Sequence, residues 1–159
     1  MLNPHGRSAL ENNLVLTIVA LLLLTLVPTL TSMIRQVRDT RVEMTGRTFL
    51  ESLSILHNRW LIQRSNRIDG LLFNPEGWPE GTVTAGKDDG LMTCSTLWQA
   101  IMTQTGLTAS SLPESGSDFL VQHPAAHLCL YRYQQTTPDT RTRILLYQMG
   151  SGSVQTIIH

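Results

Sequence analysis

The feature that most constrains this chain is an uncharged, strongly apolar run of 21 residues at positions 14–34. As a helix rising about 1.5 Å per residue, the run spans about 30 Å, the hydrocarbon thickness of a bilayer. The run is longer than the core of a typical secretory signal, and the TLTSM segment at its end offers a poor small-residue cleavage site. The sequence therefore predicts a transmembrane helix at 14–34, preceded by a short N-terminal stub or leader at 1–13.

Charge bears on the partners and on the orientation of such an anchor. Twelve basic and twelve acidic residues give a formal net charge of zero, so the chain carries no electrostatic footprint for nucleic acid. Arg35, Arg38 and Arg41 follow the apolar run, whereas Arg7 alone precedes it. Counted by the positive-inside rule, this asymmetry would place the downstream domain in the cytoplasm.

The two cysteines indicate the opposite side of the membrane. Cys94 and Cys129 form no C-x-x-C motif, and the sequence shows no cluster of cysteines and histidines typical of a metal site. They fit one structural disulfide closing about 35 residues, which would stabilise the fold by roughly 3–4 kcal/mol and would require an oxidising, export-side compartment. The alternative is a pair of buried free thiols in a cytoplasmic domain. We favour the disulfide.

Helical character is expected to continue from residue 35 to residue 65. No proline occurs between residues 35 and 63, and apolar residues recur at steps of four, three and four. This spacing places them on one face of an amphipathic helix extension, where they are expected to pack against a domain. The residues are Phe49, Leu53, Leu56 and Trp60.

The remaining residues, 66–159, predict a small globular α+β head. The Asp69-Gly70 dipeptide suits a tight hairpin turn, and the proline- and glycine-rich segment 74–81 is expected to be a loop. Residues 88–106 predict a short helix ended by Gly106, and residues 107–118 a serine-rich loop. Asp88, Asp89 or Thr93 is suited to cap that helix.

The last third of the chain predicts a three-stranded antiparallel meander. The segments HLCLYRYQQ, RTRILLYQM and VQTIIH are rich in strand-forming residues and are separated by turn residues. The expected fold class is therefore α+β, with a long N-terminal helix packed on a small antiparallel sheet. One half of that helix spans a membrane, and the other half is amphipathic.

No segment carries convincing catalytic chemistry. The five histidines (His5, His57, His123, His127 and His159) lack the spacing of a metal site, and the proline within HPAAH argues against a helix presenting His123 and His127 together. Asp88 and Asp89 offer oxygen ligands for calcium, although capping of a helix is the more ordinary use of such residues. We therefore expect no enzymatic activity, no metal, no cofactor and no small-molecule substrate.

The layout resembles the type IV pilin and pseudopilin family. That family is cut after a glycine, carries a glutamate five residues later, and often has a proline twenty-two residues after the glycine. Gly6, Glu11 and Pro28 stand at these positions in front of and inside the apolar run. The resemblance implies a processing site between Gly6 and Arg7 and places Glu11 and Pro28 in the assembly helix.

Physical chemistry supplies a reason for the glutamate. In a bundle of apolar helices a lone carboxylate is costly, and pairing it with the freed α-amine of a neighbouring subunit would mark the register between subunits. Proline removes a helical hydrogen bond, so Pro28 would bend or locally open the helix. This chain departs from the family in having Arg7 after the glycine, and Arg7 and Glu11 also fit an ordinary surface pair four residues apart.

Residues 49–159 resemble a narrower group, the MshF family of the mannose-sensitive haemagglutinin (MSHA) pilus. The resemblance lies in FLESLSILHNRWLIQ, IDG, GWP, a cysteine before LW, CLYRY and a closing hairpin. It implies a pilin-like, non-catalytic accessory subunit in pilus assembly, anchored in the bacterial inner membrane. It also implies a periplasmic C-terminal domain with Cys94 bonded to Cys129, other pilins as partners, and incorporation into the pilus as an option.

Two other functions are kept open by the sequence. The first is a pseudopilin or bitopic inner-membrane scaffold of a secretion machine that is not built into a fibre. The second is a ligand-binding sensor domain on a single anchor, which would require a deep pocket between helix and sheet. A solid core in that position would argue against the sensor.

Overall fold

A computed structural model describes residues 4–84, 90–113, 116–134 and 141–159, and the side chains of these except residues 4–10, 90 and 91. The chain divides into two compact units, Met1–Arg38 and Asp39–His159. Helix α1 (Pro4–Gln63) begins in the first unit and ends in the second. The amphipathic part of α1 from Asp39 onward thus belongs to the same compact unit as the sheets.

In the first unit, α1 is held by backbone hydrogen bonds and by hydroxyl groups that bond back to the helix. Thr17, Thr25, Thr29, Thr31 and Ser32 each donate to a carbonyl oxygen three or four residues earlier, over 2.8–3.2 Å. Such back-bonding satisfies a hydroxyl inside an apolar segment without any external partner. Polar residues can therefore occupy this segment at little cost in hydrocarbon.

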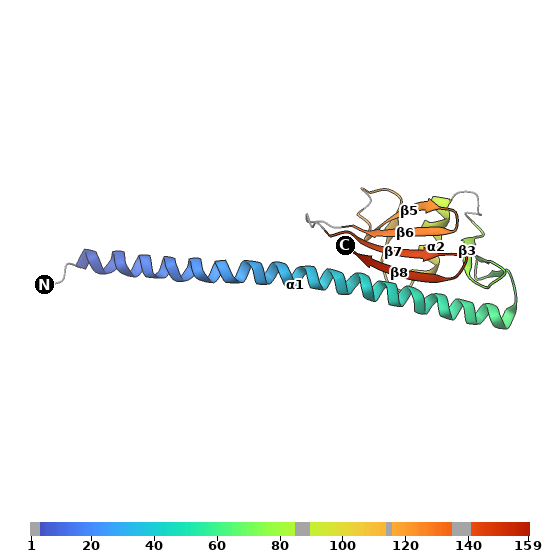
Figure 1. The fold of residues 1–159 in the computed structure, drawn as a ribbon, viewed down its shortest axis with the longest axis horizontal. Helices are drawn as coiled ribbons and strands as arrows, with labels where there is room; N and C mark the ends of the chain where they lie inside the picture. The colour runs from blue at the N-terminus through green and yellow to red at the C-terminus, as the bar shows by residue number, and fades with distance from the viewer. Residues whose placement is uncertain (1–3, 85–89, 114–115, 135–140) are drawn as a thin grey trace. The chain divides into compact units, whose positions relative to one another are not determined.

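The second unit is built around a five-stranded sheet with the order β4-β5-β6-β7-β8 (Figure 1). Strands β6 (Leu128–Tyr133), β7 (Arg143–Gln148) and β8 (Ser153–Ile158) form the antiparallel meander that the sequence predicts. Strand β5 (Phe119–Ala125) adds antiparallel to β6, and β4 (Ala109–Ser110) adds parallel to β5. The α+β class is confirmed, with a mixed sheet rather than a purely antiparallel one.

Strands β4 and β5 were not expected from the sequence. The expected serine-rich loop contains β4, and the HPAAH segment contributes His123, Pro124 and Ala125 to β5. Proline fits there because the register shifts between Gln122 and Ala125, so the ladder does not require its missing N–H. The alternation of buried Phe119 and Val121 drives this strand onto the core.

A second, three-stranded sheet follows the end of α1, in the order β1-β2-β3. Strands β1 (Arg67–Ile68) and β2 (Leu71–Phe73) are joined at Asp69 and Gly70, whose φ angles are 51° and 79°. Two consecutive positive φ values define the tight hairpin turn that the dipeptide predicts. The expected loop at 74–81 is only partly a loop, because β3 (Pro79–Thr82) starts within it on the sheet edge, where proline is tolerated.

Helix α2 (Gly90–Met102) lies close to the predicted short helix but ends earlier. Residues 103–105 form turns, and Gly106 adopts a φ of 68° four residues beyond the last helical residue. Gly106 therefore reverses the chain after the helix instead of terminating it directly. Asp88 and Asp89, which are expected to cap the helix or to bind calcium, lie outside the described residues.

The core of the second unit fills the space between α1, α2 and the five-stranded sheet. The Phe49 ring on α1 packs against the rings of Trp98, Tyr131 and Tyr147, with centroid distances of 5.5–5.9 Å. Aromatic pairs in such tilted and edge-on arrangements contribute beyond their buried area. Fully buried side chains come from every layer: Val42, Phe49, Leu53, Leu97, Trp98, Tyr131, Leu145 and Tyr147.

Candidate functional site

The apolar part of α1 in the first unit is a continuous surface of exposed hydrocarbon. Large apolar side chains between residues 14 and 34 are 47–72% exposed, and the helix is long and apolar enough to cross a membrane. Soluble monomers rarely leave so much contiguous apolar surface in water. A helix with this surface is suited to span a lipid bilayer.

The residues expected to act in processing and register lie along this helix. Glu11 is exposed in α1, and Pro28 lies within an unbroken stretch of the helix. Gly6 and Arg7 fall in the first turns of α1, and their side chains lie outside the described residues. The Glu11 carboxylate is therefore accessible to a cation of a neighbouring chain, whereas its pairing with Arg7 involves a side chain outside the described residues.

The four residues expected to pack α1 on the sheet lie on the helix face that contacts the core. Phe49 and Leu53 are completely buried, and Leu56 and Trp60 are half-buried against the same core. Trp60 lies against Gly77, where an added Cβ atom would come within 2.3 Å of the indole ring. Gly77 also has a φ of 85°, so a side chain there is doubly disfavoured.

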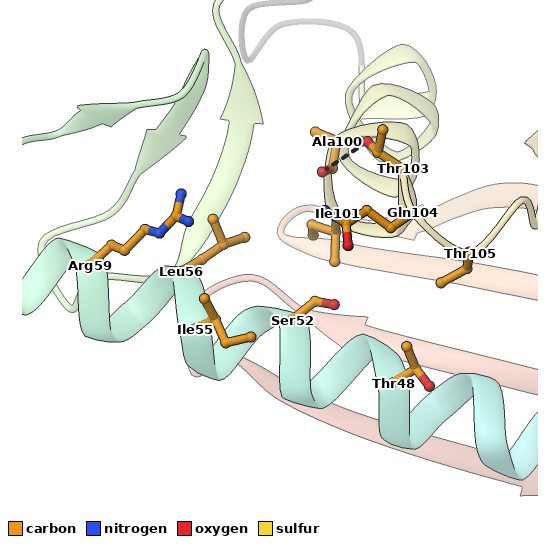
Figure 2. Close-up of a pocket in the computed structure, with 10 residues that line it drawn as sticks. All are labelled: Thr48, Ser52, Ile55, Leu56, Arg59, Ala100, Ile101, Thr103, Gln104 and Thr105. Atoms are coloured by element: carbon orange, nitrogen blue, oxygen red, sulfur yellow. Dashed lines mark hydrogen bonds between the residues drawn. The ribbon is translucent and has the colours of Figure 1, made fainter.

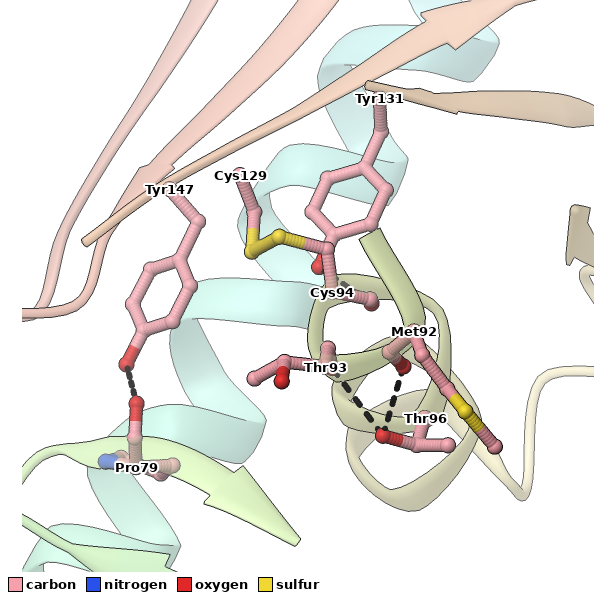
Figure 3. The surroundings of a disulfide bond; sticks show 8 residues. All are labelled: Pro79, Met92, Thr93, Cys94, Thr96, Cys129, Tyr131 and Tyr147. Carbon is pink, nitrogen blue, oxygen red and sulfur yellow. Dashed lines mark hydrogen bonds between the residues drawn. A yellow bond between two sulfur atoms is a disulfide. The ribbon is translucent and has the colours of Figure 1, made fainter. Parts of the chain in front are cut away.

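The structure joins Cys94 of α2 to Cys129 of β6 in a disulfide, with a Cα–Cα distance of 5.5 Å (Figure 3). Both cysteines are completely buried. Tyr131 lies beside the bond, and its hydroxyl group donates a hydrogen bond to the Cys94 carbonyl oxygen over 2.9 Å. Helix and sheet are therefore linked at one place by a covalent bond and a buried hydrogen bond.

The two buried tyrosines near the disulfide have perturbed acidities. Burial raises the pKa of the Tyr131 phenol well above its ordinary value of 10.0, and the neighbouring Tyr147 adds to the shift. Burial likewise raises the pKa of Tyr147, with a further contribution from the charge of Glu80. Tyr147 donates to the Pro79 carbonyl oxygen over 2.7 Å, so the neutral form of each phenol is the form the fold accommodates.

These shifts predict a loss of stability in alkali. An unfolded tyrosine ionises near pH 10 while the folded phenols keep their protons, so their stabilising contribution is complete below pH 10 and is lost as the pH rises further. An unfolded phenol with a pKa of 10.0 is half ionised at pH 10, so each group loses about 1 kcal/mol over the next pH unit, and we expect the free energy of unfolding to fall by about 2 kcal/mol from pH 10 to pH 11. Urea unfolding at a series of pH values would measure it.

The matched control is the double variant Tyr131→Phe, Tyr147→Phe. It loses two hydrogen bonds at every pH, but its stability should depend much less on pH between 10 and 11. An equally steep alkaline loss in the double variant would show that other groups cause the effect.

A buried ion pair that the sequence did not reveal attaches α1 to the sheet. Asp39 on α1 accepts a hydrogen bond from Arg143 Nε over 2.6 Å and another from Arg141 Nη1 over 2.8 Å. Arg143 lies in β7 and is completely buried, whereas Asp39 and Arg141 are partly exposed. A buried guanidinium requires such a partner, because desolvation of an uncompensated charge is costly.

A groove of about 370 Å³ lies between α1 and the C-terminal end of α2 (Figure 2). Its α1 side carries Thr48, Ser52, Ile55, Leu56 and Arg59, and its α2 side carries Ala100, Ile101, Thr103, Gln104 and Thr105. The only titratable group among these is Arg59, which is ion-paired with Asp69 over 2.7 Å. Hydroxyls, an amide and aliphatic groups supply no general base or nucleophile pair.

The groove also bears on the sensor hypothesis. It lies between two helices, whereas the space between α1 and strands β6 and β7 is filled by completely buried side chains. Among the described residues, no three His, Cys, Asp or Glu side chains are close enough to share a metal ion. The described residues of the second unit thus form a packed core on this face of the sheet.

Comparisons with protein-family models, curated proteins and solved structures gave no match to this chain. The class is therefore defined by the geometry alone. It is an α+β protein in which one long N-terminal helix supplies a candidate membrane span and then packs on a small sheet. A disulfide ties the shorter helix to that sheet.

Proposed function

We propose that the chain is a pilin-like accessory subunit in the assembly of a type IV pilus of the MSHA type. It acts by packing of its N-terminal helix and by contacts of its globular unit. One observation supports this most: a single helix, α1, carries an exposed apolar surface in the first unit and then supplies the core residues Phe49 and Leu53 of the second. A helix with these two parts suits a subunit that is anchored in a membrane before it is incorporated into a filament.

In this proposal, α1 anchors the chain once in the bacterial inner membrane, and the second unit lies in the periplasm. The disulfide supports that side, because such bonds persist in oxidising compartments. Three arginines follow the apolar run, which opposes this orientation by the positive-inside rule. We give the disulfide more weight, because the bond joins two completely buried cysteines in the core of the second unit.

Glu11 is proposed to set the register between helices, through the α-amine of a neighbouring subunit cleaved after Gly6. We expect Glu11→Ala to leave the second unit folded, because the residue lies outside it, and to reduce the number of pili per cell severely. Thermal unfolding and electron microscopy of the cells measure the two effects. Glu51→Ala, on the exposed face of the same helix, is the control. Normal piliation with Glu11→Ala would remove the residue from the mechanism.

The alternative function is a bitopic scaffold or pseudopilin of a secretion machine, which stays in the membrane and never enters a fibre. The exposed apolar helix suits this role equally well. Mass spectrometry of the mature N-terminus separates the two. A methylated terminus at Arg7 is the result expected of a processed pilin, and an intact Met1 is the result expected of the scaffold.

A further inference from the structure

Strand β8 forms an open edge of the five-stranded sheet. It pairs with β7 on one side, and no described strand lies on the other. Thr142 and His159 exchange two backbone hydrogen bonds of 2.9 and 3.0 Å, which fixes the phase of the antiparallel ladder. Because hydrogen-bonded and open positions alternate along such a ladder, the N–H and C=O groups of Val154, Thr156 and Ile158 point away from β7.

These backbone groups have no partner in the part of the chain that the structure describes. Natural sheets usually protect such an edge with charged residues, prolines or bulges, or by covering it. Strand β8 has the sequence SVQTII, which contains no charge and no proline, and its pairing with β7 shows no register shift. Thr156 is exposed although its side chain lies on the α1 side of the sheet, so the edge is not covered there.

A small groove of about 130 Å³ runs beside this edge, between β8 and α1. It exists because α1 approaches β8 closely at Gly46, where an added Cβ would come within 2.5 Å of Thr156 Oγ1. Its volume is close to the roughly 150 Å³ of a cavity that accommodates benzene, so it holds about one aliphatic side chain. The groove is lined by Glu43, Gly46, Arg47, Leu50, Val154 and Thr156.

We propose that β8 is a docking edge for an extended, uncharged segment of another protein, which adds to the sheet as a sixth strand. Its backbone would pair with Val154, Thr156 and Ile158, and one inward aliphatic side chain would enter the groove against Leu50. Backbone pairing supplies affinity and the groove supplies selectivity, as in other cases of strand addition. The uncharged edge and the mutually paired Glu43 and Arg47 favour a segment without charges.

A second copy of the chain fits this edge less well. Two β8 strands related by a two-fold axis pair antiparallel, which reverses the direction of everything packed beside them. Asp39, where the chain enters this unit, is bonded to Arg143 at the β8 end that carries Ile158. The two entry points would therefore lie at opposite ends of the joint sheet. This choice of occupant rests on the proposed anchoring of all copies in one membrane.

The test uses the full-length chain with an added C-terminal strand that pairs with the open edge of β8. A threonine, an Asn-Gly turn and the strand Thr-Thr-Val-Thr-Val-Thr-Val are added after His159, so that the turn closes on an open backbone position and the added strand folds back along β8. The matched control carries the tail Thr-Pro-Thr-Pro-Thr-Pro, which lacks half of the N–H donors. Hydrogen–deuterium exchange, resolved to single amides, is measured in detergent micelles and in membrane vesicles from cells that naturally produce the protein.

In micelles, the added strand should slow exchange of the Val154, Thr156 and Ile158 amides at least about tenfold relative to the proline tail. In native vesicles, the unmodified chain should show the same protection. Failure of the added strand to protect these amides, or rapid exchange of the unmodified chain in vesicles, would overturn the proposal. Protection of the unmodified chain in micelles that rises with protein concentration would overturn the choice of another protein, because a second copy of the chain would then occupy the β8 edge. None of these readouts depends on pili, so the proposed function can fail separately.

Discussion

Replacing Asp39 with alanine is expected to lower the free energy of unfolding of the second unit by about 3–5 kcal/mol. The carboxylate is bonded to Arg143, whose side chain is completely buried, and to Arg141 at the surface. Removing it takes this carboxylate away from the guanidinium while the Arg143 charge stays inside the fold. Urea unfolding of the full-length chain in detergent, followed by tryptophan fluorescence, would measure the change.

Glu43→Ala is the matched control for Asp39→Ala. Glu43 lies one turn further along α1 and pairs with Arg47 over 2.7 Å, but both side chains are more than half exposed. Exposed pairs of this kind contribute about 0.5 kcal/mol or less. A double variant, Asp39→Leu with Arg143→Leu, should recover part of the loss, because the buried charge is then absent. Equal losses for Asp39→Ala and Glu43→Ala would contradict the assignment.

Loss of the disulfide is the second large effect we expect. The bond closes a sequence separation of 35 residues, and the double variant Cys94→Ala, Cys129→Ala should lose about 3–4 kcal/mol of stability by the loop-entropy relation. Both sulfur atoms are buried, so a small packing loss adds to this figure. Urea unfolding of the variant and of the wild type, each with and without reductant, would measure it.

The reductant distinguishes the bond from the packing around it. It should destabilise the wild type by a similar amount and leave the double variant unchanged. A double variant within about 1 kcal/mol of the oxidised wild type would show that the unit does not depend on the bond.

The elements that the sequence predicts well are those with a strong local signal. The apolar run, the Asp69-Gly70 turn and the strands β6, β7 and β8 are all encoded by residues adjacent in the chain. The face of α1 that carries Phe49 and Leu53 also follows from helical periodicity. In each case the local preference and the tertiary packing agree.

The elements that the sequence does not predict depend on distant partners. Strand β4 is only two residues long and is stabilised by pairing with β5, so its own sequence carries little signal. HPAAH indicates a loop by composition. Strand β5 nevertheless continues into it, because Phe119 and Val121 are buried in the core and a register shift accommodates the proline. Asp39 and Arg143 are 104 residues apart, and nothing near either one marks it as buried or paired.

The edge of β8 illustrates the same limit at a candidate functional site. The segment VQTIIH is expected to be a strand from composition, but which of its backbone groups are open depends on the strand order. The groove beside it needs Gly46 of α1 to lie against Thr156, a contact between residues 110 positions apart in sequence. Sequence patterns alone cannot supply such a juxtaposition.

Counting pili on cells that lack the chain tests the proposed role in type IV pilus assembly. We expect the deletion to reduce surface pili strongly, and a plasmid carrying the wild-type chain to restore them. An unchanged number of pili per cell in the deletion strain would contradict the account.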